Sequence, residues 1–152
     1  MTNPSKSKGT AFETATCRYL AERLGQEPYR AALHGNRDVG DLHGVTVAGM
    51  PVLIECKAHK SYGPADVAEW HNQTLVEVAN ARAAVGLLVI KQPGTGAKTF
   101  GRNRCDLTVA DLLRMLDAYP IAEGLGAFWA TLDLSTVCDV IRYINDNKED
   151  KR

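Results

Sequence analysis

The sequence lacks the features that mark membrane, secreted and zinc-binding proteins. No apolar run approaches the roughly 18 residues of a membrane-spanning helix, so we expect no membrane span. Residues 1–9 are polar and basic with no apolar stretch behind them, which predicts a cytoplasmic protein rather than a secreted one. No cysteines form a C-x-x-C pair and no histidine pair has zinc-ligand spacing, which argues against a structural zinc site.

Aromatic residues are also scarce, at 7%, but hydrophobic residues make up 45% of the chain. That proportion is enough for a sizeable core, and 152 residues are a normal length for one domain, so we expect residues 1–152 to form a single domain. The four cysteines are widely spaced. We expect reduced thiols, with Cys17 and Cys56 in the core.

The chain has no excess of either charge, with 18 Lys and Arg against 18 Asp and Glu. A neutral chain is by itself an argument against nucleic-acid binding. The charges are unevenly distributed, however, because residues 1–104 hold 13 basic and 9 acidic residues whereas residues 105–152 hold 5 and 9. The basic portion could face phosphates. A solvated surface of mixed charge explains the same distribution equally well.

Hydrophobic periodicity and turn residues predict an α/β chain. We expect residues 1–9 to be loose, and residues 92–105, which are glycine-rich and hold three basic and no acidic residues, to form a long flexible basic loop. Helices are predicted at 10–24, 65–82, 108–119 and 135–146, and strands at 28–33, 41–48, 51–58, 85–91 and 127–133.

The strand predicted at 51–58 carries charged residues that a buried strand seldom contains. Side chains alternate between the two faces of a strand. One face receives Val52, Ile54 and Cys56, and the other receives Leu53, Glu55 and Lys57. Glu55 and Lys57 therefore lie side by side among apolar neighbours, which is costly unless the charges are paired or used. A salt bridge at the end of a strand is the simpler interpretation, because the string E-x-K is common.

Asp41 opens the preceding strand and changes that balance. In a hairpin closed near Gly49, Asp41 lies opposite the region of Lys57 and reaches the same end of the sheet as Glu55. Two carboxylates at one point repel unless a cation lies between them, and their hard oxygen atoms suit Mg²⁺ or Mn²⁺. Lys57 could then orient or deprotonate a water molecule, or stabilise charge on a phosphate. Asp38 is the alternative acid, although it is expected in a loop.

Glu13 is a third carboxylate in an unusual place. It shares one stripe of the helix predicted at 10–24 with Cys17, Leu20 and Leu24, so it is an acid at the top of an apolar face. If that face packs on the sheet, Glu13 points toward the sheet. A carboxylate near a helix start that favours the helix dipole is the alternative interpretation.

Taken together, these residues resemble the PD-(D/E)-x-K nuclease superfamily, and within it the archaeal-type Holliday junction resolvases and their phage relatives. The resemblance covers roughly residues 8–91, whereas residues 92–152 resemble nothing we can name. One departure is Gly40, where the superfamily often has proline. The motifs are Lys8-Gly9-Thr10-Ala11-Phe12-Glu13, Gly40-Asp41-Leu42, Ile54-Glu55-Cys56-Lys57 and Val89-Ile90-Lys91.

The resemblance implies a restriction-endonuclease-like mixed sheet flanked by helices, with a core at 8–91, the basic loop at 92–105 and a C-terminal α/β extension at 106–152. It also implies a Mg²⁺ site that accepts Mn²⁺ as a substitute. Asp41, Glu55 and the Cys56 carbonyl would bind the metal. Lys57 would assist the attacking water, and Glu13 would complete the site directly or through water. Gln73 is a further catalytic candidate, although an exposed helix glutamine is the simpler interpretation.

The implied partner is DNA, with a four-way junction as the expected substrate and a homodimer as the expected assembly, because a two-fold dimer matches two symmetric cuts. Alternatives are a nuclease of the same fold that acts on flaps, ends or a duplex site, and a non-catalytic DNA-binding module. For each single cation, a solvated surface position is the simpler interpretation. The candidates for DNA contact are Lys8, His34, Arg37, Lys60, Lys98, Arg102 and Arg104, with Lys6, Arg30 and Asn36 as further possibilities.

Overall fold

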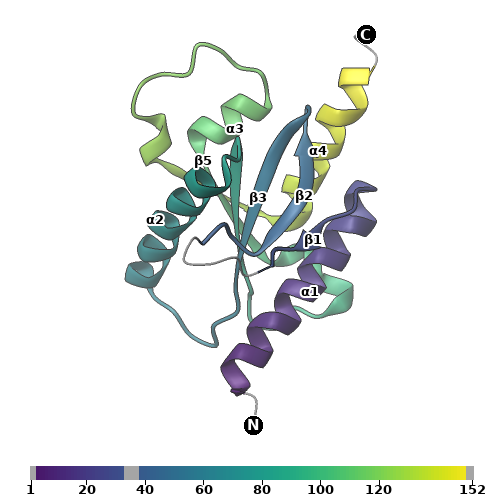
Figure 1. Cartoon of the computed structure of the whole chain (residues 1–152), viewed down its shortest axis with the longest axis vertical. Helices are drawn as coiled ribbons and strands as arrows, with labels where there is room; N and C mark the ends of the chain where they lie inside the picture. The colour runs from purple at the N-terminus through teal and green to yellow at the C-terminus, as the bar shows by residue number, and fades with distance from the viewer. Residues whose placement is uncertain (1–2, 33–37, 150–152) are drawn as a thin grey trace.

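The computed structural model describes residues 3–32 and 38–149, and these ranges form a mixed α/β structure around one six-stranded sheet (Figure 1). The strands are β1 (Tyr29–Arg30), β2 (Leu42–Val47), β3 (Met50–Lys57), β4 (Val85–Ile90), β5 (Arg104–Thr108) and β6 (Trp129–Asp133). The helices are α1 (Pro4–Leu24), α2 (Pro64–Ala81), α3 (Val109–Met115) and α4 (Leu134–Glu149), with short 3₁₀ helices η1 (Ala97–Arg102) and η2 (Leu125–Ala127).

The strands follow one another across the sheet in chain order, so that β3 and β4 are central. These two strands are parallel, and every other neighbouring pair is antiparallel. All six residues of β4 are buried, as expected for a continuous apolar run between two layers. The mixed sheet flanked by helices confirms the fold predicted from the sequence.

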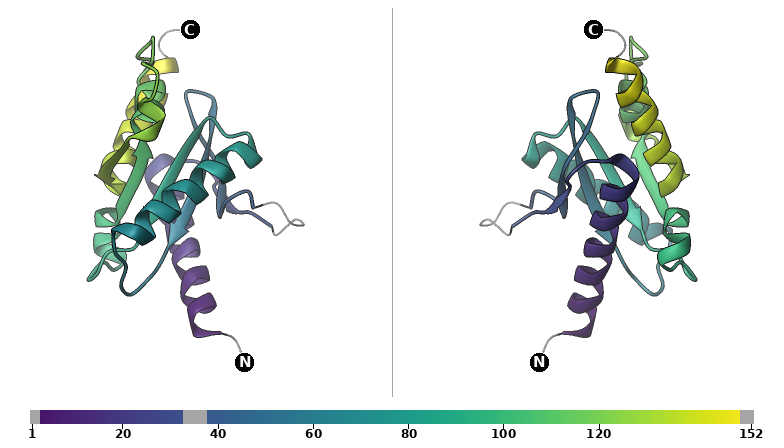
Figure 2. Two further views of the ribbon diagram at one scale, coloured as in Figure 1. Left: turned by 90° about the vertical axis from the view of Figure 1, so that its left-hand side faces the viewer. Right: turned by 90° about the vertical axis from the view of Figure 1, so that its right-hand side faces the viewer.

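Helices cover both faces of the sheet (Figures 1 and 2). The larger core lies between the sheet and the layer that contains α1 and α4, and it includes Leu20, Ile54 and Ile141. A smaller cluster of Val67, Trp70, Leu88 and Ile90 lies between the sheet and α2. No helix in the described ranges is long and apolar enough to cross a membrane.

Helix α1 begins earlier than predicted, because the loose segment expected at 1–9 contains strong helix-start residues. The Asn3 side chain accepts a hydrogen bond from the Ser5 N–H (3.1 Å), and Pro4 occupies the first turn, where its missing N–H costs nothing.

The buried face of α1 also differs from the predicted stripe. Phe12, Thr16 and Leu20 form its centre. Cys56 is buried as predicted, whereas Cys17 is partly buried and packs against the edge of the core, where its thiol donates to the Pro28 carbonyl (3.0 Å). The predicted stripe, which began at Glu13, therefore lies one residue to the side of the face that α1 buries.

The β2–β3 hairpin occurs where it was predicted, but with a different register. Ala48 and Gly49 form the turn, and both have positive φ (55° and 79°), as two-residue hairpin turns require. Val47 therefore pairs with Met50. An irregularity between Leu42 and Val45 then adds one residue to β2, so that Leu42 pairs with Ile54. Continuing this register places Asp41 level with Glu55, not with Lys57 as the sequence predicted.

The segment 92–105, predicted to be a flexible loop, is ordered. Asn103 is fully buried, and its side-chain oxygen accepts hydrogen bonds from the Gln92 N–H and the Thr95 hydroxyl (both 2.8 Å). A Cβ on Gly101 would lie 2.5 Å from the Tyr19 hydroxyl oxygen, so this glycine permits close packing rather than mobility. The prediction failed because the buried Asn103 bonds across the segment and Gly101 packs on the distant helix α1, and neither contact is visible in the local sequence.

The strands β5 and β6 extend the same sheet rather than forming a separate layer. Their buried centre is Asp106, which is 0% exposed and accepts hydrogen bonds from Arg104 (2.8 Å), His71 (2.7 Å) and Thr131 (2.8 Å). Burial alone would raise the pKa of Asp106, but these hydrogen bonds lower it overall. The His71 ring stacks on Trp129 at 3.9 Å, so this network fastens α2 to the C-terminal strands.

Candidate active site

Asp41 is fixed at the end of β3 by backbone contacts on both sides. Its N–H donates to the Ile54 carbonyl (3.2 Å), and its side-chain Oδ2 accepts from the Cys56 N–H (2.9 Å). The preceding residue, Gly40, has φ of 82°, and a Cβ there would lie 2.8 Å from Cγ of Leu53. Proline, whose φ is fixed near about −65°, cannot adopt that conformation, so the backbone before Asp41 requires glycine.

Glu55 and Lys57 lie on the face of β3 that is covered by α2, as strand alternation predicted. The Lys57 ammonium lies 2.9 Å from Oε1 of Glu55 and donates to the side-chain oxygen of Gln73, also at 2.9 Å. The Glu55 side chain is only 5% exposed. The structure therefore brings Gln73 to the site through Lys57, and the simple salt bridge is one part of a larger group.

Glu77 is an additional carboxylate that the sequence did not reveal to us. It lies on α2 four residues after Gln73 and is 0% exposed, and neither side-chain oxygen has a hydrogen-bond partner among the described residues. Glu55 is its close neighbour, and a proton on Glu55 would let that group donate to Glu77. An orphaned buried carboxylate is costly to the fold, so its position points to function.

Burial and mutual repulsion make these acids hold protons unusually strongly. Burial and the nearby Glu55 raise the pKa of Asp41 to about 8, against the smaller lowering effect of the Cys56 N–H. Burial and the neighbouring Glu77, to which a protonated Glu55 would donate, raise the pKa of Glu55 to about 8. Burial likewise raises the pKa of Glu77 to about 7. Around neutral pH, the positive charge nearby is therefore too small to keep all three carboxylates ionised.

Lys57 supplies part of that positive charge. Burial alone would lower the pKa of Lys57, but the adjacent Glu55 raises it overall. Lys57 is therefore protonated at neutral pH. Of the roles predicted for it, donation to a developing negative charge fits the structure better than removal of a proton from water.

The donor set fits a divalent cation that takes few protein ligands. Mg²⁺ keeps several waters and binds one or two carboxylates, which Asp41 and Glu55 supply. The N–H and C=O of one strand residue point to the same edge, so the Cys56 carbonyl faces the side on which Asp41 lies. Within residues 3–32 and 38–149, no three His, Cys, Asp or Glu side chains are arranged to hold a metal. A closed zinc site, which requires more protein ligands, does not fit.

The other predicted acids lie beside the site rather than within it. Glu13 pairs with Arg30 (2.8 Å), and its charge makes a small contribution to the raised pKa of Asp41. The role predicted for Glu13, binding the metal directly or through water, therefore stays a prediction. Asp38 is exposed, and its side chain accepts from the Gly40 N–H (3.2 Å), so Asp41 rather than Asp38 lies at the site.

The predicted DNA-contacting cations do not form one group. Lys8 and Lys60 line a hollow near the end of β3. Lys98 and Arg102 are exposed on η1, and Lys6 is exposed on α1. Arg104 is bound to Asp106, so it is not a free surface cation. His34, Asn36 and Arg37 lie outside the described residues.

The sequence did contain a signal for Glu77. The buried residues of α2 are Val67, Trp70, Thr74 and Glu77, which fall at helical spacing on one face. A charged residue on that stripe is the same signal that drew attention to Glu13 on α1. Lys91, which lines the hollow, belongs to the motif Val89-Ile90-Lys91, but the sequence alone assigned no role to its side chain.

Comparison with known proteins gives one clear structural relative. No protein-family model matches the sequence, and neither does any curated protein. Among solved structures, the chain is similar to Hjc, a Holliday junction resolvase from the archaeal hyperthermophile Archaeoglobus fulgidus, with a TM-score of 0.51 and 18% identity. The match covers 86% of this chain and 99% of that chain, so it extends beyond residues 8–91 into the C-terminal strands and helices. The chain therefore has the fold of a Holliday junction resolvase.

Proposed function

We propose that this protein is a metal-dependent endodeoxyribonuclease that cuts branched DNA, with a four-way junction as its substrate. The observation that carries the proposal is the pair of carboxylates of Asp41 and Glu55, which share one sheet end with protonated Lys57 and have pKa values of about 8. A cation between the carboxylates would relieve their repulsion. The fold shared with a junction resolvase supports the substrate.

In this proposal Asp41, Glu55 and the Cys56 carbonyl hold Mg²⁺, or Mn²⁺ in its place. When bound, the cation would polarise the scissile phosphate and acidify the attacking water. Lys57 donates to the charge that develops on the phosphate, because its ammonium is protonated and already directed toward Glu55. From α2, Gln73 holds the Lys57 side chain through a hydrogen bond, and Glu77 positions the neighbouring Glu55 side chain.

A homodimer would present two such sites to a junction with matching two-fold symmetry. Large apolar side chains are exposed in the segment between α3 and β6, namely Leu116 (51%), Tyr119 (62%) and Phe128 (63%). Exposed apolar groups of this size favour a protein interface. The proposal predicts a dimer in solution by light scattering, and a single-chain mass at working concentration would contradict it.

The cleavage test uses a synthetic four-way junction with Mg²⁺. Wild-type protein is expected to make paired symmetric nicks, and Asp41→Asn and Glu55→Gln to lose them, because each removes one metal-binding charge. Asp38→Asn is the matched control, since Asp38 is an exposed acid only three positions from Asp41. Equal loss in Asp38→Asn, or normal nicking by Glu55→Gln, would contradict the assignment of the site.

Substrate choice requires a separate comparison. A flap, a blunt duplex and a nicked duplex of the same sequence would be incubated beside the junction. Preference for the junction supports a resolvase, whereas equal cutting of linear duplex removes that part of the proposal and leaves a nuclease of another class. Junction binding without cutting in either Mg²⁺ or Mn²⁺ would favour the non-catalytic module.

A further inference from the structure

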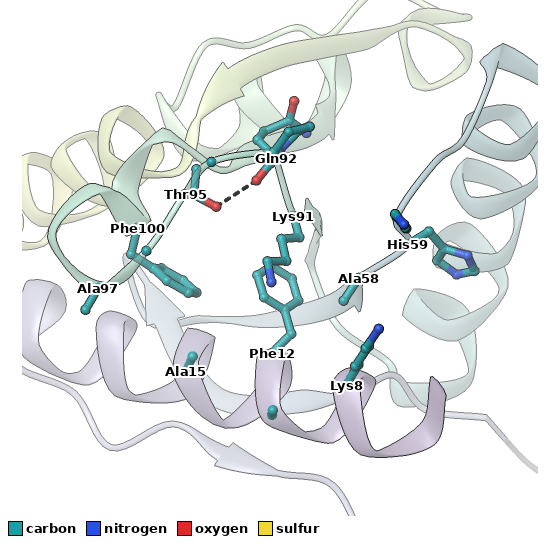
Figure 3. A pocket seen from close by; sticks show the side chains of 15 residues that line it. Lys8, Phe12, Ala15, Ala58, His59, Lys91, Gln92, Thr95, Ala97 and Phe100 are labelled. Atoms are coloured by element: carbon teal, nitrogen blue, oxygen red, sulfur yellow. Dashed lines mark hydrogen bonds between the residues drawn. The ribbon is translucent and has the colours of Figure 1, made fainter. Parts of the chain in front are cut away.

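A hollow of about 630 Å³ opens between the first half of α1 and the segment that follows β4 (Figure 3). We call it the basic pocket and define it by Lys8, Lys60, Lys91, Phe12 and Phe100. In Figure 3 the ammonium ends of Lys8 and Lys91 project into the space, and the ring of Phe100 faces it. Its volume lies within the range of about 300–1,000 Å³ that is common for small-ligand sites.

The basic pocket adjoins the candidate active site through the backbone. The Lys91 N–H donates to the Lys57 carbonyl (2.9 Å), and Ala58, which follows Lys57, lines the pocket. Because β3 and β4 are parallel, their C-terminal ends open on the same edge of the sheet. The Lys57 side chain faces α2, whereas the pocket faces α1. A DNA strand that crosses this edge would therefore meet both.

The charge of the basic pocket is unbalanced. Its lining residues include three lysines and no acid. In the described part of the chain, none of the three lysines has an acidic partner within ion-pair distance. Three unpaired ammonium groups around one hollow attract an anion.

The floor of the basic pocket is aromatic and apolar. The rings of Phe12 and Phe100 lie 5.7 Å apart between their centroids, and alanines complete the wall. A purely inorganic anion would gain nothing from such a floor. A nucleotide combines a flat aromatic base, which packs on phenylalanine rings, with a phosphate that lysines can neutralise.

We propose, on the basis of the proposed nuclease function, that the basic pocket receives one unpaired nucleotide beside the phosphate that is cut. A base inside a duplex is paired and stacked, so it cannot enter a concave pocket unless it leaves the stack. The substrate class is then DNA with an unpaired or readily unpaired nucleotide next to the cleavage point. This condition is met at a branch point and not within a regular duplex.

The test measures binding in EDTA, where no cleavage occurs, by fluorescence anisotropy of a labelled short oligothymidylate and a blunt duplex of equal length. Two variants perturb the basic pocket in different ways. Lys91→Ala removes a cation, and Ala97→Trp fills the space from an exposed wall position. Lys148→Ala and Ala79→Trp are matched controls at exposed helix positions outside the lining.

Both pocket variants should weaken oligothymidylate binding by about tenfold, Ala97→Trp because it displaces one stacked base and Lys91→Ala because it removes one phosphate contact. Duplex binding should change less than about threefold, because a paired and stacked nucleotide does not enter the basic pocket and its phosphate does not reach Lys91 there. The controls should change neither. Equal losses for both DNAs would overturn the proposal and make the pocket part of a general basic surface, and so would unchanged oligothymidylate binding by both pocket variants.

Free thymidine monophosphate distinguishes a DNA nucleotide from a small-molecule ligand. It should compete only weakly, because it lacks the neighbouring phosphates, and binding as tight as that of the oligonucleotide would contradict the proposal. The binding test of the basic pocket and the cleavage test of the nuclease proposal can fail independently. Absent junction cleavage with intact single-strand preference removes only the nuclease proposal, whereas normal cleavage with no such preference removes only the pocket proposal.

Discussion

Glu55 and Glu77 are buried and Asp41 is partly buried beside them, with a single lysine in the group. Such an arrangement costs stability, because buried charges without full pairing are unfavourable. An apolar or neutral set of side chains would satisfy the fold better. Acids that remain protonated until about pH 7 to 8 are therefore best explained by a ligand that replaces those protons.

This explanation predicts how the metal-free protein responds to pH. The folded pKa values of Asp41 and Glu55 are about 8, above their ordinary values of 3.8 and 4.5, so the folded protein binds more protons than the unfolded chain between those limits. The associated stability is complete below about pH 4 and is lost as the pH rises through about 8. In EDTA, urea denaturation should give a lower free energy of unfolding near pH 8 than near pH 6.

Asp41→Asn should reduce that dependence, because asparagine stays neutral and can still accept from the Cys56 N–H. Saturating Mg²⁺ should restore wild-type stability near pH 8 by binding the ionised carboxylates. Asp38→Asn should keep the wild-type slope. An identical slope in wild type and Asp41→Asn would show that this carboxylate is not titrating as described.

Lys57 should act in the chemical step rather than in metal binding. Lys57→Ala removes the donor beside Glu55 and is expected to lower kcat by about 10²–10³-fold, the range found when one charge-stabilising donor is lost. Gln73→Ala, which only releases Lys57, should cost about tenfold. Single-turnover cleavage at saturating Mg²⁺ measures both. A loss through metal affinity alone, with kcat unchanged, would contradict the role.

At the scale of elements, the sequence was sufficient where local patterns determine structure. The β2–β3 hairpin, α2 and β4 were predicted because turn residues, Pro64 and a continuous apolar run are local signals. The position of Asp41 relative to Glu55 was not, because it depends on one extra residue in β2. A shift of one residue changes which side chains meet across a hairpin.

The segment 92–105 shows where local composition misleads, because it was predicted to be flexible and is ordered. Its glycines and basic residues are typical of a flexible loop, yet Asn103 bonds to Gln92 across the segment and Gly101 packs against Tyr19 and Ser135, which lie far away in the sequence. Glu77 was missed for a related reason. Its helix was predicted correctly, but the significance of an acid on the buried face becomes clear only once Glu55 is placed opposite it.

Gly40 positions Asp41 just before β2, so replacing it should affect both stability and metal binding. Gly40→Ala places a Cβ 2.8 Å from Leu53 at positive φ and should lower the free energy of unfolding by about 1–3 kcal/mol. It should also weaken Mn²⁺ binding by displacing Asp41. Gly49→Ala is the matched control, since Gly49 has a similar φ of 79° but open space around it.

Gly49→Ala should lose stability by denaturation yet retain Mn²⁺ affinity, because the hairpin turn lies at the far end of β3. Equal Mn²⁺ affinity in the two variants would contradict the link between Gly40 and the site. The comparison of Gly40→Ala with Gly49→Ala does not depend on DNA cleavage, so it tests only the local geometry around Asp41.

At the scale of the whole molecule, β5 and β6 hold α2 in place as well as widening the sheet. Asp106→Asn should lower the free energy of unfolding by about 3 kcal/mol, because Arg104 and His71 lose a buried charged partner. Since the folded pKa of Asp106 is lowered, its contribution is present above the ordinary aspartate pKa and is lost as the pH falls through the folded value.

Urea denaturation measures this difference, with Asp133→Asn as a control on an exposed acid of the neighbouring strand. A loss of stability in Asp106→Asn no larger than that in Asp133→Asn would mean that the network does not join the two parts of the sheet. Because α2 carries Gln73 and Glu77, the Asp106 variant should also lower cleavage indirectly.

The central claim is that Asp41 and Glu55 are kept together to hold a divalent cation, and calorimetric titration with Mn²⁺ tests it most directly. Wild-type protein should bind one Mn²⁺ per chain near pH 7 and release protons as it binds, since the carboxylates are partly protonated beforehand. Glu55→Gln should abolish binding and Asp38→Asn should preserve it. No Mn²⁺ binding by the wild type, or undiminished binding by Glu55→Gln, would contradict the account.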